Sequence, residues 1–243
     1  MKILIVNDDG IYSPGILGLA QVAKSFGDVT IVAPDVERSS MGHAVTHSRP
    51  LSYRRTAVQG FDAFRVDGTP ADCVAIGFSV AGKADVVLSG INLGLNIGNG
   101  MWHSGTLAGA KQAALMESRG IALSAPLSSE EWNFERLAPH VAAALGILLP
   151  DPTLTLVNVN FPKEPRGHLW TRQSVRHYDG KVVPSKDPMG RTHYWFTVFP
   201  LEETEEGTDR WAVDHDFVSM TPLRLDLTDH RALEAQLERA RAK

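Results

Sequence analysis

Short apolar runs and stretches of helical periodicity alternate over about the first 160 residues. The apolar runs are rich in Ile, Leu and Val, which is typical of strands that are buried on both faces. They cover residues 3–6, 29–33, 63–66, 85–89 and 154–159. Helical spacing follows at residues 14–26, from about residue 70, at 106–117 and within 134–149. This alternation predicts an α/β fold with a doubly wound, mostly parallel sheet.

The pattern changes in the last third of the chain. Polar alternation separated by turn residues predicts strands at 170–176, 181–183 and 193–198, and a further extended piece at 223–227. Thr228 is placed to cap a last helix, in which Leu233 and Leu237 are the large apolar residues. We therefore expect a core at residues 1–162 and a hairpin-rich extension with a terminal helix at 163–243.

Composition and charge narrow the class of protein. The 243 residues are 43% hydrophobic and 21% charged, which is ordinary for a globular protein. A net charge of −4 offers no basic surface for nucleic acid or for a membrane. No apolar run approaches the roughly 20 residues of a membrane span, and the first strand leaves no room for a signal peptide. Cys73 is the only cysteine, so no intramolecular disulfide can form, and we expect a cytoplasmic enzyme.

The first strand ends in Asn7-Asp8-Asp9-Gly10. In open parallel sheets, ligands bind beyond the carboxyl ends of the strands. Asp8 and Asp9 repel each other there unless a positive charge lies between them, and a divalent cation is the simplest candidate. A plain turn is the alternative, because Asx-Gly pairs are frequent in turns.

Two further loops follow strands. In the loop at 35–48, the Ser39 hydroxyl can serve a metal ion or an anion, although a polar loop serine is more often without function. The loop at 89–106 is rich in glycine and asparagine, and six of the 21 glycines of the chain lie within residues 90–109. Glycine lets a ligand approach the backbone, and asparagine supplies a neutral oxygen for a cation.

The second of these loops leads into Ser104-Gly105-Thr106 at a predicted helix N-terminus, where N–H groups and the helix dipole favour phosphate. A capped helix after an irregular turn is the alternative, but a mere turn does not need so many glycines and asparagines. The donors in the three loops are hard oxygen atoms, which suit Mg²⁺, Mn²⁺ or Ca²⁺ better than Zn²⁺. His43 and His103 also lie in these loops, where each either assists proton transfer or packs.

Four ordered motifs resemble the SurE family of stationary-phase survival proteins, which act as 5′-nucleotidases. They lie at residues 7–10, 33–39, 68–73 and 89–106, with further similarity at 157–162 and 217–223. The resemblance implies a Rossmann-like core that hydrolyses nucleoside 5′-monophosphates with one divalent cation per subunit, Mg²⁺ or Mn²⁺. It also implies 3′-nucleotides and short polyphosphate as further substrates, and homo-oligomers, dimers or tetramers, that exchange their C-terminal extensions.

Carried over by position, the resemblance assigns four metal ligands: Asp8, Asp9, Ser39 and Asn92. Asp8, Asp9 and Asn92 are also expected to be catalytic. We expect a second set to bind the substrate: Ser40, Gly42, His43, Asn96, Ser104, Gly105 and Thr106. The chain departs from many relatives at Asn99-Gly100, where they have acidic residues, and at His103, where they have tyrosine. These departures put the substrate preference and the pH profile in question.

Rival classes fit the sequence less well. Aspartyl-phosphatases of the haloacid dehalogenase type need Asp-x-Asp after their first strand, where this chain has Asp8-Asp9-Gly10. A dinucleotide oxidoreductase needs Gly-x-Gly-x-x-Gly there, which is absent. A nucleotide sensor without turnover can use the same loops and remains the alternative function. The sequence leaves open the preferred nucleotide, the metal, and whether water or Asp8 is the nucleophile.

Overall fold

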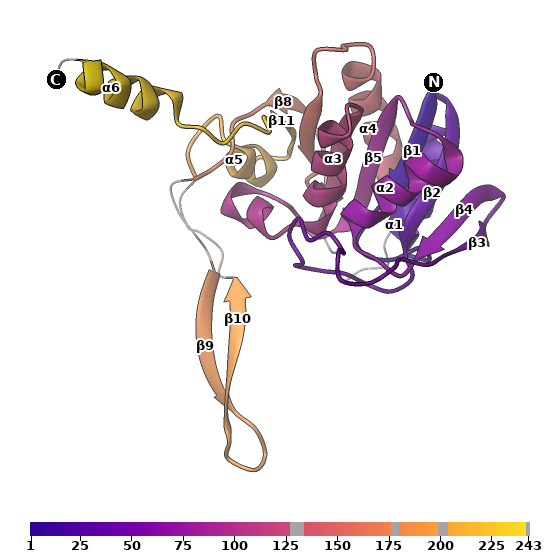
Figure 1. Cartoon of the computed structure of the whole chain (residues 1–243), viewed down its shortest axis with the longest axis horizontal. Coiled ribbons are helices and arrows are strands. Elements are labelled where there is room, and N and C mark those ends of the chain that lie inside the picture. The colour runs from indigo at the N-terminus through magenta and orange to yellow at the C-terminus, as the bar shows by residue number, and fades with distance from the viewer. Residues whose placement is uncertain (127–133, 176–179, 199–203, 242–243) are drawn as a thin grey trace.

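The computed structural model describes residues 1–126, 134–175, 180–198 and 204–241. Figure 1 shows a body of strands and helices from which a long hairpin and the last helix project. None of the helices in these residues is both long and apolar enough to cross a membrane.

The body is built on a mixed sheet, which has nine strands within the described residues, in the order β3-β4-β2-β1-β5-β6-β7-β11-β8. They are β1 (Lys2–Val6), β2 (Asp28–Pro34), β3 (Tyr53–Val58), β4 (Phe61–Val66), β5 (Val86–Leu93), β6 (Arg119–Ala125), β7 (Leu156–Asn160), β8 (Gly167–Trp170) and β11 (Phe217–Pro222). The six strands from β4 to β7 in this order run parallel, whereas β3 and β11 pair antiparallel with β4 and β7. The predicted α/β class with a doubly wound, mostly parallel sheet is confirmed.

Helices cover both faces of the sheet. They are α1 (Pro14–Ala23) and α4 (Phe134–Leu148) on one face, and α2 (Pro70–Ala81) and α3 (Gly105–Leu115) on the other. Successive side chains of a strand point to opposite faces. Accordingly, Ile3 and Ile5 of β1 pack in the core with α1 and α4, whereas Leu4 and Val6 pack in the core with α2.

Capping residues fix the starts of α2 and α3. Thr69 and Asp72 form a capping box, in which the Thr69 hydroxyl accepts from the Asp72 N–H at 3.1 Å and the Asp72 carboxylate accepts from the Thr69 N–H at 2.9 Å. Ser104 caps α3 by accepting from the Leu107 N–H at 3.0 Å. Because α2 follows β4 and α3 follows β5, these helix starts lie at the carboxyl ends of parallel strands.

The last third of the chain contributes to the body and to both projections. Strands β8 and β11 extend the main sheet, so strands from both sides of residue 162 share one sheet, and the expected division there stays a prediction. A separate antiparallel hairpin consists of β9 (Gly180–Lys186) and β10 (Thr192–Val198), and α5 (Asp209–Asp214) packs near β11. The last helix, α6 (His230–Arg241), has no buried residue and extends away from the body in Figure 1.

Several elements differ from the sequence-based expectation. The edge strand β3, strand β6 and helix α5 were not expected. The strand expected at 170–176 is wrong over 171–175, because pairing with β11 ends at Trp170; residue 176 lies outside the described residues. Residues 223–227 form no strand. The last helix is capped by Asp229, whose carboxylate accepts from the Ala232 N–H at 2.9 Å, and not by Thr228.

Candidate functional site

Asp8 and Asp9 follow β1, which lies between β2 and β5 in the sheet. This is the point where the strand order reverses, and ligands of doubly wound sheets bind there. Asp8 is only 5% exposed and accepts a hydrogen bond from the Thr106 hydroxyl at 2.8 Å, while its backbone oxygen accepts from the Arg38 N–H at 2.7 Å. Asp9 accepts from the Leu93 N–H at 3.4 Å. The three loops that the sequence singled out therefore meet at this acidic pair.

The acidic pair is electrostatically unfavourable without a cation. Burial raises the pKa of Asp8. The hydrogen bond from Thr106 lowers it, but by less than burial raises it. Burial, and then the charge of Asp8, raise the pKa of Asp9 to about 6. The charge of Glu37 raises both pKa values further, although this residue was not singled out from the sequence because it lies in an ordinary polar loop. Such a site favours binding of a positive ion.

The oxygen donors in the loops that meet at the pair fit a divalent cation of the Mg²⁺ or Mn²⁺ type. The Asn92 amide nitrogen donates to the Gly94 oxygen at 2.7 Å, so its side-chain oxygen is the atom that it can offer to a metal ion. The Ser39 hydroxyl donates to Glu37 at 2.6 Å and keeps its lone pairs. Among the described residues, no three His, Cys, Asp or Glu side chains are grouped closely enough to hold an ion. Neutral oxygens such as these are therefore needed to complete a ligand set with Asp8 and Asp9.

The N-terminus of α3 lies directly against Asp8. A Cβ atom on Gly105 would come within 2.8 Å of both Cβ and Oδ2 of Asp8, so a residue without a side chain is required for this approach. The Thr106 hydroxyl donates to Asp8 from the same first turn of the helix, so this turn faces the acidic pair. The positive end of a helix dipole at this position favours a phosphate group beside the metal ligands.

Asn96 contacts Thr106, which in turn contacts Asp8. Its amide nitrogen donates to the Thr106 hydroxyl at 3.1 Å and to the Ser124 hydroxyl at 2.8 Å. Its backbone oxygen accepts from the side chains of Asn158 at 2.7 Å and Asn160 at 3.1 Å. This buried network supports the hydrogen bond from Thr106 to Asp8, and a direct contact of Asn96 with phosphate stays a prediction.

The remaining predicted substrate residues belong to the loop after β2. Ser40 is exposed, with a backbone φ of 58°. The Gly42 N–H donates to the His103 oxygen at 3.0 Å, and the His43 ring bonds to Gln112 of α3 at 2.9 Å. These bonds fasten the loop to α3 and to the 3₁₀ segment η1 (Gly98–Trp102) that precedes His103. None of them reaches Asp8 or Asp9, so the substrate roles of the loop stay predictions.

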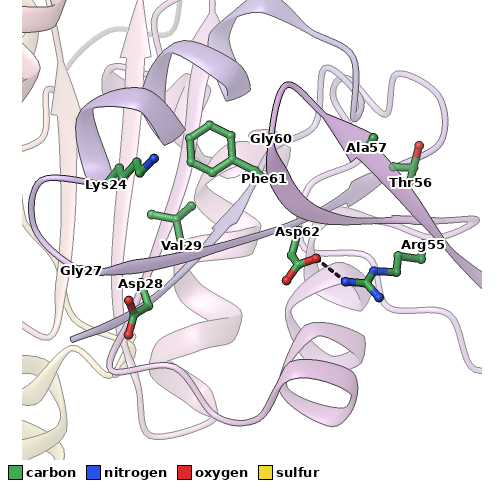
Figure 2. A pocket seen from close by; sticks show the side chains of 10 residues that line it. All are labelled: Lys24, Gly27, Asp28, Val29, Arg55, Thr56, Ala57, Gly60, Phe61 and Asp62. Carbon is green, nitrogen blue, oxygen red and sulfur yellow. Dashed lines mark hydrogen bonds and ion pairs between the residues drawn. The ribbon is translucent and has the colours of Figure 1, made fainter.

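Two hollows differ in their relation to the acidic pair. A cavity of about 540 Å³ is bordered by Asp9, residues 10–14, residues 35–37 and Leu93. A second cavity, of about 670 Å³, lies at the opposite ends of the strands, where β2 and β4 begin, and is shown in Figure 2. Figure 2 also shows that Arg55 and Asp62 in its wall are paired with each other. The cavity beside Asp9 is therefore the one that adjoins the candidate site.

Fold and site together define the class: an α/β protein in which an acidic pair, two polar loops and a helix N-terminus meet at the switch point of a doubly wound sheet. A family model described as "Survival protein SurE" matches residues 3–180, and the chain belongs to the SurE family.

Relatives agree with this assignment over almost the whole chain. The 5′-nucleotidase SurE 1 of Thermus thermophilus is 47% identical over 242 residues, which cover 97% of this chain and 96% of the relative. The 5′-nucleotidase SurE of Geotalea uraniireducens is 41% identical, with 97% of each chain covered. The crystal structure of the SurE protein from Aquifex aeolicus matches with a TM-score of 0.83 and 40% identity, and covers 97% of this chain and 98% of that one.

Proposed function

We propose that this protein is a divalent-metal-dependent phosphatase that hydrolyses nucleoside 5′-monophosphates to nucleoside and phosphate. The observation that carries the proposal is the buried Asp8, which lies beside Asp9 and accepts a hydrogen bond from Thr106 in the first turn of α3. The names of the relatives, 5′-nucleotidase SurE at 47% and 41% identity, support the activity and the substrate class.

In this proposal Asp8, Asp9, Ser39 and Asn92 hold the cation. When bound, a divalent cation offsets the negative charge that develops on the phosphoryl oxygens during P–O cleavage. One Mg²⁺ or Mn²⁺ per subunit fits the hard oxygen donors. The fit is supported by the raised pKa values of Asp8 and Asp9, which mark a site where two ionised carboxylates need a positive partner.

The protein's own groups bind and orient the phosphate. The N-terminus of α3, with Ser104, Gly105 and Thr106, stabilises its oxygens through N–H groups and the helix dipole. Thr106 holds the Asp8 carboxylate by donating to one of its oxygens, and Asn96 fixes the Thr106 hydroxyl in turn. Asp8 then acts as a general base toward water or as the nucleophile itself. Rapid-quench trapping of a phospho-aspartate on Asp8 distinguishes these routes, because only the second forms it.

A panel of phosphate esters tests the activity and its range. We expect phosphate release from AMP with Mg²⁺ or Mn²⁺, none with EDTA, and slower release from 3′-nucleotides and short polyphosphate. Stable binding of AMP with Mg²⁺ and no release from any ester would instead identify a nucleotide sensor.

We also propose that the protein forms a homo-oligomer through its two projections. Helix α6 has 12 residues, and an isolated helix of this length is marginal in water. Leu233 and Leu237 on it are 46% and 48% exposed, and Tyr194, Trp195 and Phe196 of the hairpin are exposed as well. A second copy of the chain is the partner that covers these surfaces in a dimer or tetramer. The buried Cys73 thiol fits a reducing compartment, and we place the enzyme in the cytoplasm.

A further inference from the structure

We propose that the cavity beside Asp9 is the nucleoside subsite, in which Tyr12 stacks on the base and Asp35 accepts hydrogen bonds from the ribose hydroxyls. This inference rests on the proposed function, because it names the part of the substrate that is bonded to the phosphate.

The position and size of the cavity fit this occupant. It is bordered by Asp9 at one end, and its volume of about 540 Å³ lies within the roughly 300–1,000 Å³ that is typical of small-molecule sites. Asp8 contacts the N-terminus of α3, where the phosphate is proposed to bind, whereas Asp9 borders the cavity. A group esterified to that phosphate can therefore extend past Asp9 into the cavity.

The charges of the wall select a neutral ligand rich in hydroxyl groups. Asp9, Asp35 and Glu37 line the cavity, and none of its lining residues is basic. An anionic group is repelled from such a wall, so the phosphate itself is excluded from the cavity. The three carboxylates are not grouped closely enough to hold a metal ion, since the described residues contain no such group. Hydroxyl groups of a sugar are the donors that carboxylates of this kind accept.

Tyr12 provides a fixed aromatic wall. The residue is 66% exposed, yet its hydroxyl is bonded to Thr56 of strand β3 at 3.1 Å. This bond holds the ring in place from its far end and leaves the ring surface accessible. Val36 and Leu93 supply apolar surface in the same cavity. Base stacking on an aromatic ring tolerates every base, because each has a π-face, and this suits an enzyme of broad nucleotide range.

Asp35 lies at the end of the second strand, where an acidic residue of dinucleotide-binding sheets contacts the ribose. It follows directly on Pro34, the last residue of β2, and its backbone N–H donates to the Val66 oxygen at 2.9 Å. In dinucleotide-binding sheets an acidic residue at the end of the second strand accepts from the ribose hydroxyl. Its carboxylate is only loosely paired with Arg38, at 3.5 Å. Glu37, in contrast, already accepts from the Ser39 hydroxyl at 2.6 Å, which makes Asp35 the freer acceptor.

Calorimetric binding of adenosine, 2′-deoxyadenosine and inorganic phosphate to the full chain with Mg²⁺ tests the subsite without any turnover. Tyr12→Ala is expected to weaken adenosine binding about tenfold, the loss typical of one stacked base. Tyr12→Phe keeps the ring and is expected to stay within about twofold. Asp35→Asn is expected to remove most of a roughly tenfold preference for adenosine over 2′-deoxyadenosine. Binding of inorganic phosphate is expected to change in none of these variants.

Trp102→Ala is the matched control. Trp102 is an exposed aromatic residue that does not line the cavity, and the Lys111 ammonium lies 5.9 Å from its ring centre. Loss of adenosine binding in this variant, or unchanged binding in Tyr12→Ala, overturns the proposal. A wild type that hydrolyses AMP but shows no preference for adenosine over 2′-deoxyadenosine overturns the role of Asp35. If the wild type releases no phosphate, the same affinities still decide the subsite, so the two proposals fail separately.

Discussion

At the scale of single residues, the site depends on close contacts around Asp8. This carboxylate is buried, bonded to Thr106, and packed against the backbone of Gly105. The sequence showed the carboxylates and the helix start, because each is a local motif. It did not show Glu37 as a contributor to the charge, since an acidic residue in a polar loop carries no local signal.

Gly105→Ala tests the contact between α3 and Asp8. The added methyl group would lie 2.8 Å from Cβ and Oδ2 of Asp8, so the carboxylate must move. We expect phosphate release from AMP to fall about a hundredfold, as for other small displacements of catalytic groups. Gly100→Ala is the control in the same loop, because a Cβ atom there meets nothing within 4 Å. Equal activities of the two variants would contradict the assigned role of Asp8.

The raised pKa values predict a pH dependence of metal binding. Asp9, with a pKa of about 6 against an ordinary 3.8, binds a proton in the folded state that the unfolded chain has already released. Its contribution to the stability of the metal-free protein therefore falls as the pH rises from about 4 to 6. A cation needs the ionised carboxylate, so its affinity is expected to rise about tenfold per pH unit below 6.

Thermal unfolding with and without Mg²⁺ at pH 5, 6 and 7 measures this effect. The increase in melting temperature that Mg²⁺ causes is expected to grow with pH and to be lost in Asp9→Asn. The same increase at pH 5 and pH 7 would show that no group with a raised pKa takes part in binding.

At the scale of elements, the sequence predicted the strands that carry the site but not the network that supports it. Strands β1, β2 and β5 are continuous apolar runs, and their loops had to meet because parallel neighbours end at one edge. Strand β6 was missed, since its small residues dilute the apolar pattern. At Gly120 a side chain is excluded, because a Cβ atom there would clash with the Ala110 oxygen of α3. Without β6, the bond from Asn96 to Ser124 could not be foreseen.

The terminal helix gives a prediction at the same scale. Leu233→Asp with Leu237→Asp places charges on the apolar stripe of α6, which is expected to lie in the interface between copies. We expect the double variant to be a monomer, or a smaller oligomer than the wild type, in light scattering after size exclusion. Glu234→Gln with Glu238→Gln, on the same helix, is the control and is expected to keep the assembly. A wild type that is monomeric at micromolar concentration would contradict the proposed interface.

At the scale of the whole molecule, one sheet organises both the site and the projections. The acidic pair lies at its switch point, and β11 and β8 extend its far side toward the hairpin and α6. The fold class was predictable because the alternation of strands and helices is regular over the first two thirds. The arrangement of the last third was not predictable, since β8 has only four residues and its residues pair with β11 residues that lie 50 positions further along the chain.

The most direct test of the account is phosphate release from AMP by wild type and Asp8→Asn, each with Mg²⁺, Mn²⁺ or EDTA. We expect metal-dependent release by the wild type and a loss of at least about a thousandfold in Asp8→Asn, because the variant lacks both a metal ligand and the base or nucleophile. The variant is expected to keep its melting temperature without metal, since an asparagine oxygen can still accept from Thr106. Near-normal release by a folded Asp8→Asn protein would contradict the placement of the catalytic centre at the end of β1.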